Sequence, residues 1–159
     1  MRAVWLVVLL TLVFGQAWPA DQGQELVAAA MTGRVDKVRD LLAQGVDANS
    51  KNPAGRSALQ LAAFNGNVLT VRALLAAGAN PGLMDGRGLT ALMDAAAFGH
   101  PEVVGLLVQA GVDVNAKDQA GNTALSFAIK GSHAMVAEIL TAAGAVEGGG
   151  EEEQEAGKK

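Results

Sequence analysis

A spacing of 33 residues recurs along this chain and constrains its fold more than any other feature of the sequence. The clearest columns are Gly45, Gly78, Gly111 and Gly144; Gly55, Gly88 and Gly121; and Leu26, Leu59, Leu92 and Leu125. The pairs Ala29-Ala30, Ala62-Ala63 and Ala95-Ala96 keep the same phase. A fixed period of this length predicts a solenoid, in which each repeat is one small unit that stacks on its neighbours.

The third repeat indicates how each unit is built. Thr90 can cap a helix over about residues 91–98, because its hydroxyl can accept a bond from a free amide of the first turn. Gly99 ends that helix, and Pro101 suits the first position of a second helix, which Gly111 ends. An extended link follows. We therefore expect an all-α fold, a solenoid of about four helix–turn–helix units with short turn or hairpin links.

The composition suits closely packed helices. Half of the 159 residues are apolar, but only 4% are aromatic and none is tyrosine. A core of this kind is filled by Ala, Leu and Val, and the small Ala pairs let neighbouring units approach closely. The chain contains no cysteine, which excludes disulfides, thiolate metal sites and cysteine nucleophiles.

Two segments of the third repeat carry a family resemblance. The chain reads D-x-x-G-x-T-x-L-x-x-A-A-x-x-G-H from Asp85 to His100 and G-x-D-V-N-A from Gly111 to Ala116, and this pattern resembles the ankyrin repeat. The resemblance implies an ankyrin repeat domain over residues 24–147. Its repeats are expected at residues 24–51, 52–84, 85–117 and 118–147, and the first of them lacks the leading turn.

The repeats depart from the family pattern in several places. The Thr-Pro-Leu-His motif of the family is replaced in three repeats, by Ser57-Ala58-Leu59-Gln60, Thr90-Ala91-Leu92-Met93 and Thr123-Ala124-Leu125-Ser126. The loss of Pro and His weakens the expected turn network without removing the helix start. Gly82 stands where Asn49 and Asn115 stand, so we expect the second link to be looser. Ile129 and Ser132 depart in the last repeat, and terminal repeats are often atypical.

The N-terminal residues have the layout of a secretory signal peptide. Arg2 precedes an apolar run from Val4 to Phe14, and Gly15-Gln16-Ala17 places small residues at the two positions that a signal peptidase reads. We predict a signal peptide over residues 1–17, cleaved after Ala17 rather than Ala20, then a short linker over 18–23. The run is too short for a membrane span, although a retained anchor is the alternative. Export to a periplasm or secretion follows, with no stable membrane insertion after cleavage.

The C-terminal residues predict a disordered acidic tail over residues 148–159. Three glycines are followed by EEEQEAGKK, and glycine maximises chain entropy while clustered carboxylates repel one another. The formal net charge of the chain is −4. An acidic chain without an aromatic–basic ladder does not predict nucleic-acid binding.

The sequence contains no convincing catalytic, cofactor or metal site. A Gly-x-Gly-x-x-Ala motif begins at Gly86, but only Gly88 recurs in the other repeats, so this glycine is interpreted as a turn residue and not as part of a phosphate loop. His100 and His133 share one column, and we expect them to bond to nearby backbone rather than to hold a metal. We therefore predict a non-enzymatic protein without a cofactor.

The resemblance implies that partners contact the turn tips and the exposed side of the first helix of each unit. Those columns give the candidate partner-binding residues Lys51, Arg56, Phe64, Asn65, Met84, Arg87, Leu89, Asp94, Phe98, Lys117, Gln119, Asn122 and Lys130. Basic and apolar side chains dominate the set, and Asp94 is expected to be its exposed carboxylate. This set predicts a protein partner with an acidic surface. We also expect the protein to be a monomer. A small-ligand binder and a membrane-anchored structural module are the alternatives.

Overall fold

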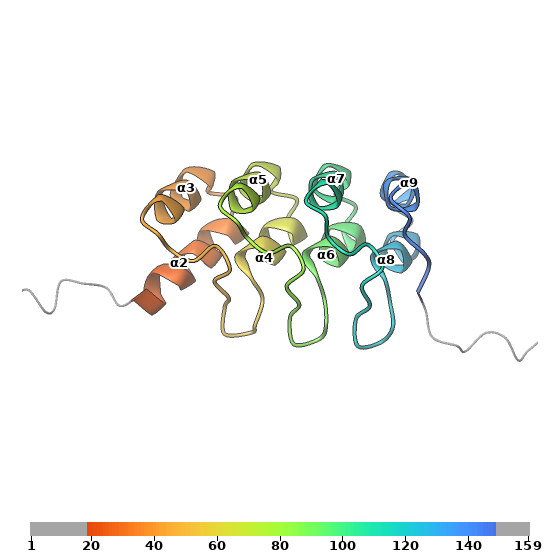
Figure 1. Ribbon diagram of the computed structural model, residues 1–159, viewed down its shortest axis with the longest axis horizontal. Coiled ribbons are helices and arrows are strands. Elements are labelled where there is room, and N and C mark those ends of the chain that lie inside the picture. The colour runs from red at the N-terminus through yellow and green to blue at the C-terminus, as the bar shows by residue number, and fades with distance from the viewer. Residues whose placement is uncertain (1–18, 149–159) are drawn as a thin grey trace, which may run out of the picture.

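The computed structural model describes residues 19–148, and this part of the chain forms a stack of helix pairs. The helices are α2 (Pro19–Met31), α3 (Val35–Ala43), α4 (Ala58–Phe64), α5 (Val68–Ala76), α6 (Ala91–Ala97), α7 (Pro101–Gln109), α8 (Ala124–Lys130) and α9 (Ala134–Ala142). Figure 1 shows the inner helices α2, α4, α6 and α8 in one layer and the outer helices α3, α5, α7 and α9 in a second. The predicted all-α repeat solenoid is confirmed.

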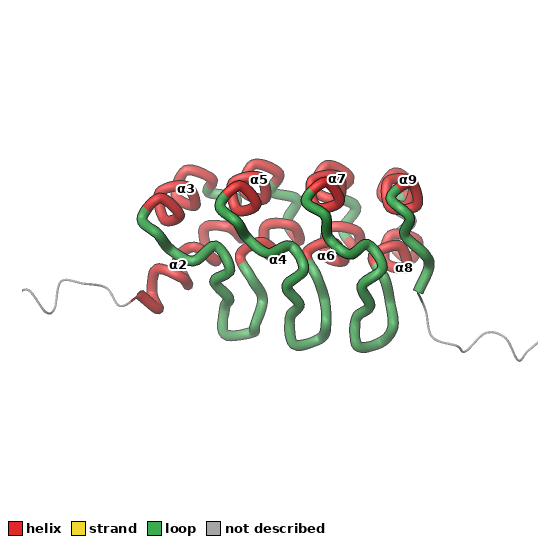
Figure 2. Tube along the Cα trace, viewed as in Figure 1, coloured by secondary structure: helices red, strands yellow, loops and turns green. Residues whose placement is uncertain are grey.

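Each outer helix is connected to the next inner helix by a loop that projects from the stack beside the inner layer (Figure 2). We call these loops hairpin 2 (residues 49–57), hairpin 3 (82–90) and hairpin 4 (115–123), because they lead into the second, third and fourth repeats. The hairpins lie in a row, so each repeat places its turn tip next to that of its neighbour (Figure 2).

The inner helices after the hairpins begin at the predicted capping residues. The Ser57 hydroxyl accepts a bond from the Gln60 backbone N at 3.2 Å, and the Gln60 side chain accepts one from the Ser57 backbone N at 2.9 Å. Thr123 caps α8 with the same reciprocal pair of bonds to Ser126, whereas the Thr90 hydroxyl caps α6 by accepting from the Met93 backbone N alone. Because these hydroxyls satisfy amides that the helix leaves free, the start of each inner helix is fixed by its own sequence.

The core lies between the two layers and continues from one repeat to the next. Leu92 is buried, as predicted, together with its equivalents Leu26, Leu59 and Leu125. The Ala pairs of the first three repeats are buried as well, and consecutive helices of each layer pack against one another. Small side chains between the inner helices therefore let leucines from both layers fill one continuous core.

Helix α2 is longer than the sequence predicted. It begins at Pro19, so the residues from there to Gly23 are helical and do not form the expected linker. Gly23 lies within this helix, and a Cβ atom at this position would lie 3.1 Å from the Ser50 Oγ. This glycine permits a close approach to the link that follows α3 and does not interrupt the helix. The predicted signal peptide, residues 1–17, lies outside the described residues.

The last described residues fold back onto the fourth repeat. The Thr123 hydroxyl donates to the Val146 carbonyl at 2.9 Å, and the Gly148 backbone N donates to the Thr123 and Ser126 hydroxyls at 3.1 and 3.0 Å. Gly148 is buried, so the prediction that the tail begins at this residue is wrong. A Cβ atom at Gly148 would lie 2.5 Å from the Thr123 Cγ2, which favours glycine there. Residues 149–159 lie outside the described residues.

The links between repeats differ as the Gly82 position predicted. The Asn49 side chain accepts a bond from the Asn80 backbone N at 2.8 Å, and Asn115 accepts one from the Val146 backbone N at 2.8 Å. These bonds tie the first link to the second and the third to the C-terminal segment. Gly82 occupies the equivalent position and has no side chain, so the second link lacks this bond.

Thr70 is a polar exception in the core. Its side chain is buried, with 1% of the residue exposed, and its hydroxyl has no hydrogen-bond partner among the described residues. Val103 and Val136 occupy the same position in the next two repeats and are buried. Thr70→Val keeps the shape and removes the unsatisfied hydroxyl. We therefore expect it to raise the free energy of unfolding by about 1 kcal/mol.

Urea denaturation measures this change as a higher midpoint with an unaltered slope. Thr90→Val is the matched control, because the Thr90 hydroxyl accepts a bond from the Met93 backbone N at 3.3 Å. The control should lose about 1 kcal/mol, the usual cost of removing a helix cap. An unchanged or lower midpoint for Thr70→Val would mean that the hydroxyl contributes to stability.

Candidate partner-binding surface

The turn of each hairpin is held by the side chain at its start. The Asp85 carboxylate accepts bonds from the backbone N of Arg87 at 2.8 Å and of Leu89 at 3.0 Å. Burial acts to raise the pKa of Asp85, but these two backbone bonds and the charges of Arg87 and Arg56 outweigh it and lower that pKa. Asp118 accepts the equivalent backbone bonds in hairpin 4. These carboxylates therefore serve the turns, and the tips present other side chains.

Neighbouring hairpins are bonded to one another. The Gln119 backbone N donates to the Arg87 carbonyl at 3.1 Å, and the Gln119 side chain donates to the Gly86 carbonyl at 2.8 Å. Lys51 reaches the Met84 carbonyl at 3.4 Å. Because these bonds cross from hairpin to hairpin, the tips form one surface with fixed spacing.

Asp94 is buried, and the prediction that its carboxylate is exposed is wrong. Only 5% of the residue is accessible, and its Oδ2 lies 2.5 Å from a guanidinium nitrogen of Arg56. The Arg56 side chain is itself only 17% exposed. Burial raises the pKa of Asp94, while the charge and the hydrogen bond of Arg56 offset part of that effect. The pair joins hairpin 2 to helix α6, so neither charge is free for a partner.

Two phenylalanines lie beside this ion pair. The Arg56 guanidinium lies 5.0 Å from the centre of the Phe64 ring, and the centres of the Phe64 and Phe98 rings are 4.2 Å apart. Phe98 is 51% exposed. The Arg56–Asp94 pair and the aromatic pair thus form a cluster across the second and third repeats, in which Phe98 offers the accessible apolar surface.

The structure separates the predicted residues into three groups. The exposed residues are Lys51, Asn65, Met84, Arg87, Phe98, Lys117, Gln119 and Lys130. The partly buried residues are Arg56, Phe64, Leu89 and Asn122. Asp94 alone is buried. The exposed set follows the hairpin tips and the ends of the inner helices, and its charged members are all basic.

A comparison with family models establishes what this stack is. The family model described as ankyrin repeats in three copies matches residues 26–118 and also residues 69–148. The chain belongs to the ankyrin repeat family. None of the curated proteins compared with the chain matches it. Ankyrin repeats are general protein–protein interaction modules, and the family is typically non-enzymatic.

The ankyrin histidines bond to the backbone of the preceding repeat, as the sequence predicted. His100 Nε2 lies 3.0 Å from the Phe64 carbonyl oxygen, and His133 Nε2 lies 3.0 Å from that of Ala97. Because a carbonyl oxygen only accepts, each imidazole carries a proton on Nε2. Asn67 takes the same position one repeat earlier and donates to the Ala30 carbonyl at 3.1 Å.

Gln60 is a structural residue of the ankyrin stack that the sequence analysis missed. It is buried, and its amide donates to the Leu89 carbonyl of the next hairpin at 2.6 Å. It occupies the last position of the Thr-Pro-Leu-His motif, so an amide replaces the imidazole and still connects two repeats. The Ser-x-x-Gln spacing of a capping box was the available signal.

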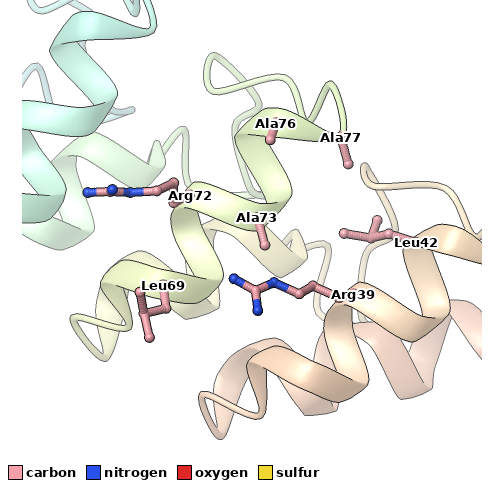
Figure 3. Close-up of a pocket in the computed structure, with 7 residues that line it drawn as sticks. All are labelled: Arg39, Leu42, Leu69, Arg72, Ala73, Ala76 and Ala77. Atoms are coloured by element: carbon pink, nitrogen blue, oxygen red, sulfur yellow. The ribbon is translucent and has the colours of Figure 1, made fainter.

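A groove on the outer layer was not predicted. Its volume is about 390 Å³, and it is lined by Arg39, Leu42, Leu69, Arg72, Ala73, Ala76 and Ala77 of α3, α5 and the turn after α5. Arg39 extends toward α5, whereas Arg72 points away from α3 (Figure 3). Polar groups therefore do not converge in the groove, and its leucine and alanine side chains provide no catalytic group.

The described residues were compared with the requirements of a metal site and of a membrane-spanning helix. Across residues 19–148, no three His, Cys, Asp or Glu residues are placed to hold a metal ion together. Over the same residues, no helix combines the length and the apolar character that a membrane crossing requires.

Proposed function

We propose that this ankyrin stack binds a partner protein through the hairpin tips and the exposed side of the inner helices. The observation that carries the proposal is that the exposed charged side chains among the predicted residues of this face are basic. The carboxylates of Asp85, Asp94 and Asp118 are engaged by the fold, whereas Arg87 is exposed at the tip of hairpin 3 and Lys117 is exposed on the first arm of hairpin 4. A basic rim beside the exposed ring of Phe98 suits a partner with an acidic surface and an apolar side chain.

The rigidity of the stack supports this proposal. Bonds between neighbouring hairpins fix the spacing of the tips before a partner arrives, so little conformational entropy remains to be lost on binding. A partner with matching spacing gains contacts from several repeats at once.

The proposal is tested by crosslinking and pull-down from the compartment to which, as we propose below, the protein is exported. We expect Arg87→Glu/Lys117→Glu to reduce recovery of the partner by about tenfold or more, because charge reversal adds repulsion at the rim. Arg39→Glu/Arg72→Glu on the outer layer is the matched control and should recover the partner normally. Equal recovery by all three proteins would rule out the tips as the recognition surface.

We also propose that the protein is exported and that it acts as a monomer. The signal-like N-terminal sequence supports export. Mass spectrometry of the exported protein should give an N-terminus at Trp18, which follows Ala17. An intact Met1 would contradict cleavage and favour a membrane-anchored module.

A further inference from the structure

Among the described residues, no helix pair follows α8 and α9, so this pair forms one end of the stack (Figure 1). Ala30, Ala63 and Ala96 share one column of the inner helices, and each is 0% exposed. Ile129 continues this column in α8 and is 46% exposed. Because the column is buried wherever another described repeat follows, the inner helix of the next repeat is what covers it.

The outer layer changes in the same way at this end. Val38, Val71 and Val104 are fully buried in α3, α5 and α7, whereas Ala137 is only partly buried in α9. The end of the stack therefore presents apolar side chains from both layers, and Ile129 is the bulky one. Because isoleucine is much larger than alanine, a helix that packs here needs small side chains opposite it.

Lys130 lies next to Ile129 in the chain and has hydrogen-bonding capacity left. Its ammonium donates to the side-chain oxygen of Asn122 at 2.7 Å, which uses one of three N–H groups. The Asn122 amide in turn donates to Asp118 at 3.1 Å, so a neutral group lies between the lysine and that carboxylate. Within residues 19–148, Lys130 forms no ion pair. The ammonium is therefore held in place and can donate to a further acceptor.

The second repeat shows which acceptor suits such a cation. Arg56 and Phe64 stand in the columns of Asn122 and Lys130, and the Arg56 guanidinium lies 5.0 Å from the centre of the Phe64 ring. The same two positions are thus in contact in both repeats, and each pair contains one cation. In the second repeat, the inner helix of the next repeat supplies the carboxylate of Asp94 to that cation. Lys130 is the equivalent cation of the last described repeat.

We propose that the end of the stack binds a helix of a partner protein, with small side chains against Ile129 and an Asp or Glu carboxylate at Lys130. This helix packs on α8 as α6 packs on α4, and its carboxylate repeats the contact between Arg56 and Asp94. The ion pair adds little affinity by itself but selects an acidic residue at one position of the helix. The inference goes beyond the proposed function, because it adds a second binding surface to the hairpin tips.

A peptide titration of the full chain tests the proposal. The probe is a synthetic peptide with the sequence of residues 90–98, which contains α6 and Asp94. A side-chain lactam bridge holds it helical, because so short a helix is not stable alone. We expect the peptide to shift the amide NMR signals of α8 and α9 with a dissociation constant in the millimolar range. The same peptide with Asp94→Asn should bind about threefold more weakly, because it loses one exposed ion pair.

Variants of the protein identify the residues that bind the peptide. Lys130→Gln should weaken binding of the Asp94 peptide by about threefold and leave binding of the asparagine peptide unchanged. Lys117→Gln is the matched control, because it removes another exposed lysine of the fourth repeat, and it should bind as the wild type does. Ile129→Ser should weaken both peptides, because it removes apolar contact area.

Three results would overturn the proposal. The first is equal binding of the two peptides, and the second is an equal effect of Lys130→Gln and Lys117→Gln. The third is a dimer in sedimentation experiments without peptide that Ile129→Ser dissociates, which would assign the end of the stack to a second copy.

The peptide titration and the capture of a partner can fail independently. If the peptide does not bind α8 and α9 but Arg87→Glu/Lys117→Glu reduces capture, the inference is rejected and the proposed function stands. If the peptide binds in a way that depends on Lys130 and capture is unaffected by the tips, the inference stands and the proposed function fails.

Discussion

Gly99→Ala is expected to lower the free energy of unfolding by about 3 kcal/mol. Gly99 adopts a φ of 70°, a left-handed conformation that costs an alanine about 1–2 kcal/mol. Its missing side chain matters as well, because an added Cβ atom would lie within van der Waals overlap of His133 Nδ1. The ring would have to turn away and lose its bond to the Ala97 carbonyl, which is worth about another 1 kcal/mol or more.

Gly111→Ala separates these two causes. Gly111 has a similar φ of 79°, but nothing lies within 4 Å of an added Cβ atom there. We expect this control to lose only the conformational term, about 1–2 kcal/mol. Both losses are measured by urea denaturation of the full chain. If the two variants lose the same stability, the histidine contact is not what requires glycine at position 99.

Asp94→Leu is expected to cost about 3 kcal/mol, because it leaves the largely buried guanidinium of Arg56 without its partner. The repeats themselves suggest the compensating change. Leu61 occupies the position of Asp94 in the second repeat, and Leu89 occupies the position of Arg56 in the third. Arg56→Leu/Asp94→Leu therefore places residues that the stack already accommodates and should recover most of the loss.

A double-mutant cycle from denaturation midpoints measures this coupling. If the double variant is as unstable as the sum of the single variants, the two residues are not coupled. The pH dependence gives a second measure. Because the pKa of Asp94 is raised above its ordinary value of 3.8, the folded state binds a proton more readily than the unfolded chain. The contribution of Asp94 to the free energy of unfolding therefore falls as the pH rises from its ordinary pKa to its raised pKa in the folded protein. The double variant should lose this pH dependence.

The periodic columns were sufficient to predict the helices, their caps and the buried leucines. Each of these features depends on residues close together in the chain, such as Thr90 with Met93, or on a column that every repeat keeps. The bonds of His100 and His133 could be predicted in the same way, because residues 33 positions apart have equivalent neighbours in successive repeats.

The ion pair was missed because it joins residues 38 positions apart through two departures from the pattern. The sequence analysis expected both residues to be exposed, because they stand in columns that contact partners in similar ankyrin repeats. A signal was nevertheless present: Asp94 stands in a column with Leu61 and Phe127, and Arg56 stands in one with Leu89 and Asn122. Two opposite charges in columns of adjacent repeats that hold no other charge indicate a pair.

The buried end of the chain was missed for a different reason. A run of three glycines has the composition of a flexible tail, and composition does not show that Gly148 fits where a Cβ atom would overlap Thr123. Only the folded contacts distinguish a glycine chosen for flexibility from one chosen for its small size.

Because Arg56 and Asp94 neutralise each other, different parts of the binding face should control the association rate and the dissociation rate of a partner. The Arg56–Asp94 pair adds no net charge to the surface around Phe98. Long-range attraction of a partner must therefore come from charges on the hairpins. For a partner bound here, changes at Lys117 or Arg87 should mainly alter the association rate and its dependence on salt. Changes at Phe98 should mainly alter the lifetime of the complex, because short-range packing determines how fast it dissociates.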